Sequence, residues 1–120
     1  MYHSKLPLNK KPLPTLKKYF LSFLKEHQKI YCSALGRPVF LNKQPNAILM
    51  RKDAKNRLEC FSVAIDILKH AKQFKQRENG QNHEFSIIGL SKEKTHVTIH
   101  LREELDKKDR RLFLISVFYK

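Results

Sequence analysis

The stretch Lys94-Thr-His-Val-Thr-Ile-His-Leu-Arg102 decides the fold, because polar and apolar residues alternate along it from His96 onward. A period of two is typical of a β-strand that buries one face. The apolar face carries Val97, Ile99 and Leu101. The other face carries His96, Thr98, His100 and Arg102. Such a polar row could act on a phosphodiester, or it could be the wet face of an antiparallel sheet, and the stretch alone leaves both open.

Helices and further strands are expected on both sides of this strand. Residues 1–14 contain three prolines and predict an extended arm. Apolar residues at helical spacing predict one helix from Thr15 to about Ile30 and a longer one from Asp53 to Asn79-Gly80. Strands are expected at residues 36–41, 47–50, 83–90 and 111–119. The sequence thus predicts an α+β fold, two helices followed by an antiparallel sheet of about four strands, in a single domain over residues 15–120.

The faces of the strands also predict which residues are neighbours, because a slip by one residue would turn every side chain to the wrong side. Glu84 and Ser86 are expected beside His100 and Thr98, and Ser116 beside Thr98 or His96. In the last strand the core set is expected to be Phe113, Ile115 and Val117. Leu112, Leu114 and Phe118 would then emerge on the polar face, a conflict that the alternation does not resolve.

The formal net charge of +14 indicates a polyanionic partner, and the basic residues are spread along the whole chain. Nucleic acid fits this spread better than a membrane surface does. Candidate phosphate contacts are Lys43, Arg51, Lys52, Lys94, Lys107, Arg110 and Arg111. No apolar run approaches the ~20 residues that span a bilayer, and nothing argues for export. We expect a cytoplasmic protein, or one delivered into a target-cell cytoplasm by a phage or within a larger protein.

The two cysteines, Cys32 and Cys60, stand alone, without the spacing of a metal site. Cys60 falls among apolar residues on a helical pattern, so we expect buried free thiols, no disulfide, no bound metal and no cofactor.

The polar face contains the groups needed to cleave RNA without a metal: a base, an acid and a cation that stabilises the phosphorane. His96 and His100 are roughly 13 Å apart along one strand, too far to act on one phosphate. We therefore expect Glu84, His100 and Arg102 to form the core of a site. Thr98 and Ser116 would donate hydrogen bonds, and His96 would be a peripheral acid. The alternative is a solvated cross-strand Glu/His pair without a catalytic role.

Four stretches carry a resemblance to a known group of proteins: Ile65–Phe74, Phe85–Leu90, His96–Glu103 and Leu112–Phe118. Their order resembles the barnase/EndoU/colicin/RelE superfold of small ribonucleases, especially toxin domains carried by phages and polymorphic toxin systems, over residues 36–120. The resemblance implies a catalytic carboxylate or His, an Arg or Lys, and a terminal-strand Ser, Thr or His on the exposed sheet face. The matching residues here are Glu84, His100, Arg102 and Ser116.

Together these features predict a metal-independent endoribonuclease of toxin type that acts on tRNA, rRNA or mRNA. A toxin of this charge is expected to have an acidic neutralising partner, such as an immunity or antitoxin protein. Two alternatives stay open. One is a non-catalytic nucleic-acid-binding module, and the other is a basic adaptor that binds an acidic protein.

Overall fold

Helices and strands alternate along the chain more than the sequence predicts. The computed structural model describes residues 1–41, 49–80, 82–106 and 109–120. Within these ranges lie the helices α1 (Leu13–Glu26), α3 (Ala54–Glu59) and α4 (Phe61–His70). The strands are β1 (Tyr2–His3), β2 (Lys29–Cys32), β3 (Arg37–Phe40), β4 (Lys75–Asn79), β5 (Asn82–Leu90), β6 (His96–Asp106) and β7 (Asp109–Tyr119). The predicted α+β class and single domain are confirmed.

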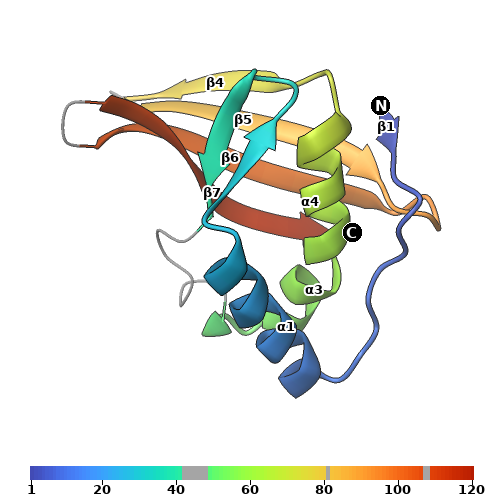
Figure 1. Ribbon diagram of the computed structural model, residues 1–120. Coiled ribbons are helices and arrows are strands. Elements are labelled where there is room, and N and C mark those ends of the chain that lie inside the picture. The colour runs from blue at the N-terminus through green and yellow to red at the C-terminus, as the bar shows by residue number, and fades with distance from the viewer. Residues whose placement is uncertain (42–48, 81, 107–108) are drawn as a thin grey trace.

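The strands form one mixed sheet in the order β1-β5-β6-β7-β3-β2, and β4 pairs with β5. Strands β4, β5, β6 and β7 pair antiparallel with one another in that order, whereas β1 pairs parallel with β5 and β3 parallel with β7. The expected sheet of about four antiparallel strands after two helices is therefore too small and too simple. The hairpin of β2 and β3 lies between α1 and α3 in the sequence and extends the sheet beyond β7. Helix α4 covers one face of the sheet (Figure 1).

The first helix ends at Glu26, before the predicted end near Ile30. Residues 29–32 form β2 instead, in which Ile30 and Cys32 are buried while Lys29 and Tyr31 are exposed. Two buried residues at a spacing of two fit a strand that covers the core, so pairing with β3 prevails over continuation of the helix. The strand predicted at residues 47–50 falls largely outside the described residues, and its members Leu49 and Met50 do not lie in a strand.

The second predicted helix is in fact two helices and a strand. Cys60 separates α3 from α4 with backbone angles φ −99° and ψ 3°, and α4 ends at His70. Phe74 is the one apolar residue among residues 72–78, so this segment would have almost no apolar face to bury as a helix. Residues 75–79 instead pair with β5 as β4, and the left-handed φ of +64° at Gly80 lies in the turn between the two strands.

The core lies between the sheet and α4. The predicted inward residues of β5 and β6 are buried there: Phe85, Ile87, Val97, Ile99 and Leu101. Helix α4 contributes Phe61, Val63, Ala64, Ile67 and Leu68. The helix crosses β5 so closely that a Cβ on Gly89 would lie 2.7 Å from the Ile67 side chain. Only glycine allows this approach.

A β-bulge in β7 resolves the conflict that the alternation left open. His100 lies opposite Ser116 but Leu101 lies opposite Leu114, so Ile115 is an extra residue in β7. The bulge reverses the faces on its N-terminal side, because one added residue turns the alternation over. Leu112 and Leu114 therefore join Val117 in the core cluster. The predicted core position Ile115 is wrong, because it is the extra residue of the bulge and lies outside that cluster. Phe113 is buried as predicted, at 7% exposure, but it also lies outside the cluster, beside the Phe40 ring with centroids 6.0 Å apart.

Side chains of α3 complete the C-terminal part of β7, where β3 no longer pairs with it. The Asn56 amide donates to the Tyr119 carbonyl at 3.0 Å and accepts the Tyr119 N–H at 3.2 Å. Arg57 donates to the Val117 carbonyl at 3.2 Å and to Asp53 at 3.0 Å. These bonds satisfy backbone groups that an unpaired edge would leave open.

The N-terminal residues are tied to the rest of the molecule at two places. Tyr2 and Ser4 both donate hydrogen bonds to Asp66 of α4, at 2.9 and 2.6 Å. Further along, Lys10 donates to the Tyr119 hydroxyl at 2.7 Å, and that hydroxyl donates to the buried Glu59 carboxylate at 2.7 Å. Residues 1–12 are thus attached to the sheet edge and to the last strand. Over the described ranges, no helix is long and apolar enough to cross a membrane.

Candidate nucleic-acid-binding and catalytic face

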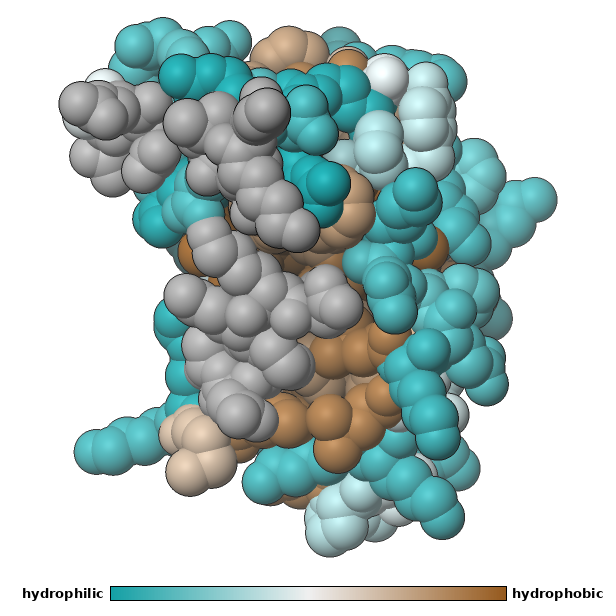
Figure 2. Space-filling view, turned by 60° about the vertical axis from the view of Figure 1, so that its left-hand side comes forward, coloured by the Kyte–Doolittle hydropathy of each residue, from teal (hydrophilic) through white to brown (hydrophobic). Residues whose placement is uncertain are grey.

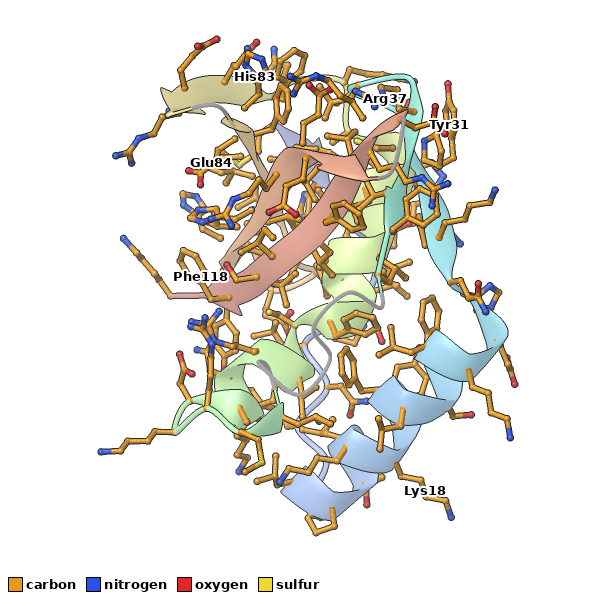
Figure 3. The ribbon with its side chains drawn as sticks, turned by 90° about the vertical axis from the view of Figure 1, so that its left-hand side faces the viewer. Lys18, Tyr31, Arg37, His83, Glu84 and Phe118 are labelled. Atoms are coloured by element: carbon orange, nitrogen blue, oxygen red, sulfur yellow. The ribbon has the colours of Figure 1, made fainter. Side chains whose placement is uncertain are left out.

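The sheet face opposite α4, which we call the open face, carries the polar residues that the sequence singles out. Glu84 and Phe118 project from it, on the side away from α4 (Figure 3). Cross-strand pairing gives its rows: Arg77, Glu84 and Arg102 lie side by side, as do Lys75, Ser86, His100 and Ser116. Ile88, Thr98 and Phe118 form the next row.

The register between β5 and β6 differs by two residues from the predicted one. Glu84 lies opposite Arg102 and Ser86 opposite His100, whereas Glu84 was expected opposite His100. A shift by two keeps every side chain on its predicted face. It makes Glu84 and His100 diagonal neighbours, with Cβ atoms roughly 7 Å apart instead of about 5 Å.

Arg102 is held by two carboxylates. Its Nε and Nη2 atoms donate to the same oxygen of Glu84, at 3.2 and 3.0 Å. Its Nη1 atom lies 3.5 Å from a carboxylate oxygen of Glu104. The Arg102 side chain is 33% exposed, so the guanidinium is both oriented and accessible.

His100 is exposed and has an aromatic neighbour. Its ring meets the ring of Phe118 edge to face, with centroids 5.5 Å apart. The guanidinium carbon of Arg57, in α3, lies 5.9 Å from the centre of the same Phe118 ring. Phe118 thus limits the positions of the imidazole without covering it.

A pocket of about 140 Å³ lies where these residues meet. It is lined by Arg77, Glu84, Phe85, Ser86, His100, Leu101, Arg102 and Ile115. The pocket therefore brings together the three residues predicted to form the core of a site, namely Glu84, His100 and Arg102. It adds a second guanidinium from Arg77 and a hydroxyl from Ser86.

The other predicted site residues do not line this pocket. Ser116 lies opposite His100 but is only 8% exposed. Thr98 lies one row away, opposite Phe118, and His96 lies near the start of β6, opposite Leu90. Their roles as hydrogen-bond donors and as a peripheral acid therefore lose their geometric support at the pocket.

The predicted phosphate contacts are scattered. Lys43 and Lys107 lie outside the described residues. Arg51 and Lys52 occupy an exposed turn before α3. Lys94 has a left-handed φ of 67° in the turn between β5 and β6. Arg110 and Arg111 lie near the start of β7. The Arg111 guanidinium lies 4.9 Å from the centre of the Phe40 ring, and the Nη1 atom of Arg110 lies 3.9 Å from a carboxylate oxygen of Glu103.

Hydrophilic side chains cover most of the molecule in the space-filling view, and apolar ones gather near its centre (Figure 2). Two basic residues of β4 were missed because residues 75–79 were assigned to a helix: Arg77 lines the pocket, and Lys75 lies opposite Ser86, which also lines it. A signal was present in Asn79-Gly80, a dipeptide typical of a two-residue hairpin turn. Interpreted as a hairpin, it would have placed Lys75 and Arg77 beside β5.

Both cysteines are buried and free, as predicted. Burial is the main cause that raises the pKa of the Cys32 thiol, and it raises the pKa of Cys60 to about 12. Neither thiol is therefore a nucleophile at neutral pH. Among the residues that the structure describes, no three His, Cys, Asp or Glu side chains are grouped so that they could hold a metal ion.

Comparisons of the chain with protein-family models, with curated proteins and with solved structures find no match.

Proposed function

We propose that the protein is an endoribonuclease of toxin type that needs no metal and uses the open face. The observation that supports this most is the pocket in which a carboxylate, an imidazole and two guanidiniums meet. A net charge of +14 favours RNA as the ligand. The resemblance to the small-ribonuclease superfold points in the same direction and stays a prediction.

Each step of RNA cleavage has a residue in this proposal. Glu84 accepts the proton of the ribose 2′-hydroxyl, and the 2′-oxygen then forms a bond to phosphorus. The bond from phosphorus to the 5′-oxygen breaks, and His100 in its protonated form gives its proton to that oxygen. The products are a 2′,3′-cyclic phosphate and a free 5′-hydroxyl. Glu84 and His100 are diagonal neighbours, so base and acid can lie on opposite sides of one phosphate.

Arg102 and Arg77 stabilise the negative charge that the phosphate gains in the transition state. Arg102 is oriented by Glu84 before any ligand binds. When the phosphate enters, its oxygens take over part of the guanidinium's hydrogen bonding, and the carboxylate then serves as the base. The ion pair is partly exposed, with side chains 33% and 26% accessible, so this exchange costs little free energy.

The test is incubation of purified protein with total cellular RNA in EDTA, followed by gel electrophoresis. The wild type is expected to cleave RNA, and His100→Ala is expected to lower the rate by about 10²- to 10⁴-fold. His27→Ala is the matched control, because it removes another exposed imidazole from the end of α1, remote from the open face. Intact RNA in every lane, with EDTA and with magnesium, would contradict the proposal.

A second candidate function is RNA binding without cleavage. The observation that favours it is that Glu84 is bonded to Arg102, since a carboxylate that only orients an Arg need not act as a base. In that case wild-type protein would bind RNA and leave it intact. A protein that does not bind RNA at all would instead fit a basic adaptor for an acidic protein.

We also propose that an acidic protein neutralises the toxin by covering the open face. The exposed cations there, Lys75, Arg77 and Arg102, would attract its carboxylates. Such a partner should protect RNA from cleavage and compete with RNA for binding. A partner that bound α1 and left cleavage unchanged would contradict this assignment.

A further inference from the structure

One edge of β5 is covered by two different strands with a gap between them. Strand β4 pairs with β5 up to Ser86, and β1 pairs with Gly89 and Leu90. Ile87 and Ile88 have no strand partner on this edge among the described residues. Along a strand, successive residues direct their N–H and C=O groups to opposite edges. The backbone of one of these two residues therefore faces the gap.

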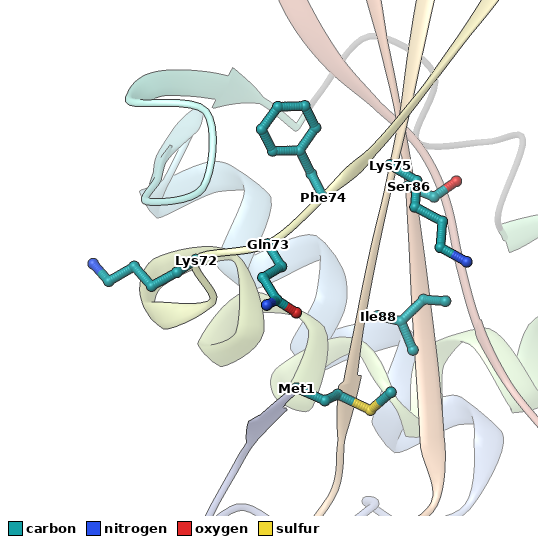
Figure 4. A pocket seen from close by; sticks show the side chains of 7 residues that line it. All are labelled: Met1, Lys72, Gln73, Phe74, Lys75, Ser86 and Ile88. Atoms are coloured by element: carbon teal, nitrogen blue, oxygen red, sulfur yellow. The ribbon is translucent and has the colours of Figure 1, made fainter.

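A hollow of about 460 Å³ lies at this gap. It is lined by Met1, Lys72, Gln73, Phe74, Lys75, Ser86 and Ile88. The Gln73 side chain points into the space between Met1 and Lys75, whereas the Phe74 ring projects from the other side of β4 (Figure 4). A second hollow of about 250 Å³ shares Met1, Gln73 and Ile88 with it and extends to the stacked rings of Tyr2 and His70.

This hollow adjoins the pocket of the proposed active site. Ser86 lines both of them. Ser86 is the direct cross-strand neighbour of His100, so the hollow begins about one strand spacing, roughly 5 Å, from the backbone of His100. A nucleotide whose phosphate occupies the pocket can place a neighbouring base in the hollow.

We propose that the hollow is a nucleobase subsite, which holds the base of a nucleotide next to the phosphate bound in the pocket. The proposal rests on the proposed function. Ile88 and Met1 offer apolar surface to the faces of a flat ring, and the Gln73 amide and the backbone at the gap offer donors and acceptors to its edge. Ser86 lies between the hollow and the pocket, where the linking phosphate would pass, and Lys75 is its cross-strand neighbour.

The chemistry of the hollow distinguishes a base from other ligands. A fatty chain would leave the Gln73 amide and the open backbone without partners, which costs free energy. A peptide strand would need a longer open edge, because only Ile87 and Ile88 are uncovered between β4 and β1. Lys75 at its rim favours a ligand that carries phosphate.

The experiment compares ribose 5-phosphate with the four nucleoside 5′-monophosphates by isothermal titration at low salt. At least one monophosphate is expected to bind roughly tenfold more tightly than ribose 5-phosphate, from the contacts of its base. Ile88→Ala and Gln73→Ala should each reduce this preference severalfold and leave the affinity for ribose 5-phosphate unchanged. Leu21→Ala and Gln28→Ala are matched controls on exposed residues of α1 and of the turn after it, and the preference should persist in both.

Arg102→Ala should weaken ribose 5-phosphate and the monophosphates by the same factor, because it changes the phosphate pocket alone. The subsite is overturned if no monophosphate binds more tightly than ribose 5-phosphate, or if the preference survives in both Ile88→Ala and Gln73→Ala. The RNA cleavage assay tests the ribonuclease proposal independently of the subsite proposal. Cleavage without a base preference contradicts only the subsite, and a base preference with uncut RNA contradicts only the ribonuclease.

Discussion

The guanidinium of Arg102 donates two hydrogen bonds to a single oxygen of Glu84, from Nε at 3.2 Å and from Nη2 at 3.0 Å. Both side chains remain partly accessible, at 33% and 26%. A pair of this kind contributes at most about 1 kcal/mol to stability. Its greater effect is to fix where the guanidinium and the carboxylate lie in the pocket, and this can be separated from stability by mutation.

Glu84→Gln keeps the shape of the side chain and removes the proposed base. We expect RNA cleavage to fall by about 10²-fold or more. RNA affinity should stay the same or rise slightly, because a negative charge facing phosphate is lost. The free energy of unfolding, measured with urea, should change by less than about 1 kcal/mol. Unchanged cleavage in Glu84→Gln would remove Glu84 from the mechanism.

Arg102→Ala should lower both cleavage and RNA affinity, because it removes a phosphate contact as well as a stabilising charge. The two variants therefore differ in binding while both lose cleavage. If affinities instead ranked only by net charge and no variant changed cleavage, the open face would be a binding surface alone.

RNA binding should weaken steeply as salt rises. Each phosphate neutralised by Lys or Arg contributes about −0.7 to −0.9 to the slope of log K against log salt concentration. Fluorescence anisotropy with a labelled single-stranded RNA, at several salt concentrations, measures this slope. Lys75→Gln, at the edge of the proposed site, should make the slope shallower by about 0.7 to 0.9, which is the contribution of one neutralised phosphate. An affinity independent of salt would exclude binding through the backbone phosphates.

Deletion of Ile115 should severely destabilise the fold. Without the extra residue, the alternation on the N-terminal side of the bulge turns over, so Leu112 and Leu114 leave the core. Exposure of two buried leucines costs several kcal/mol, of order 2–5 each by comparison with truncation to alanine. Ile115→Ala, which keeps the bulge, should cost much less. Urea unfolding compares the two, and a deletion variant with a wild-type midpoint would contradict the role of the bulge.

The thiols of Cys32 and Cys60 should be unreactive in the folded protein. Both are buried, and burial raises the pKa of Cys32 and raises that of Cys60 to about 12. Since the thiolate is the reactive form, an aromatic disulfide reagent at about pH 8 should label neither thiol until urea unfolds the chain. Rapid labelling of native protein would show that one of them is accessible.

Stability should fall at alkaline pH partly because of Tyr119. The hydrogen bond to Glu59 is the largest cause that raises the pKa of this phenol, and the bond from Lys10 opposes it. The folded-state pKa lies above the ordinary value of 10.0, so the stabilisation is fully present below that value and is lost as pH rises through the folded-state pKa.

Tyr119→Phe should therefore reduce the slope of stability against pH above about pH 10. At neutral pH it should cost about 1–3 kcal/mol, because the buried Glu59 carboxylate loses a donor. Urea unfolding at both pH values measures the two effects. Tyr31→Phe is the control, since Tyr31 is 61% exposed. An alkaline slope that is identical in Tyr119→Phe would contradict the prediction.

Alternation predicted the faces of β5 and β6 correctly, because each strand buries one side and exposes the other. It could not predict their register, since a shift by two residues keeps both faces unchanged and the choice depends on the turn between the strands. The three pocket residues Glu84, His100 and Arg102 were predicted for this reason, whereas their pairing was not.

Features that depend on pairing between distant segments of the chain could not be predicted from the sequence. Residues 75–79 are polar and exposed, and only the neighbouring edge of β5 makes them a strand. Arg77 was missed with them. The two residues of β1 are too few to show a pattern, and the bulge at Ile115 breaks the period on which the alternation argument depends.

The parallel pairing of β1 with β5 has a consequence for the order in which the protein folds. Strands β4 to β7 follow one another in the chain and can assemble through short hairpins, which form quickly. Tyr2 pairs with Gly89 and bonds to Asp66, which lies 64 residues away. During synthesis on the ribosome, Tyr2 emerges well before Asp66 and Gly89, so β1 can reach its native partners only after those residues have followed.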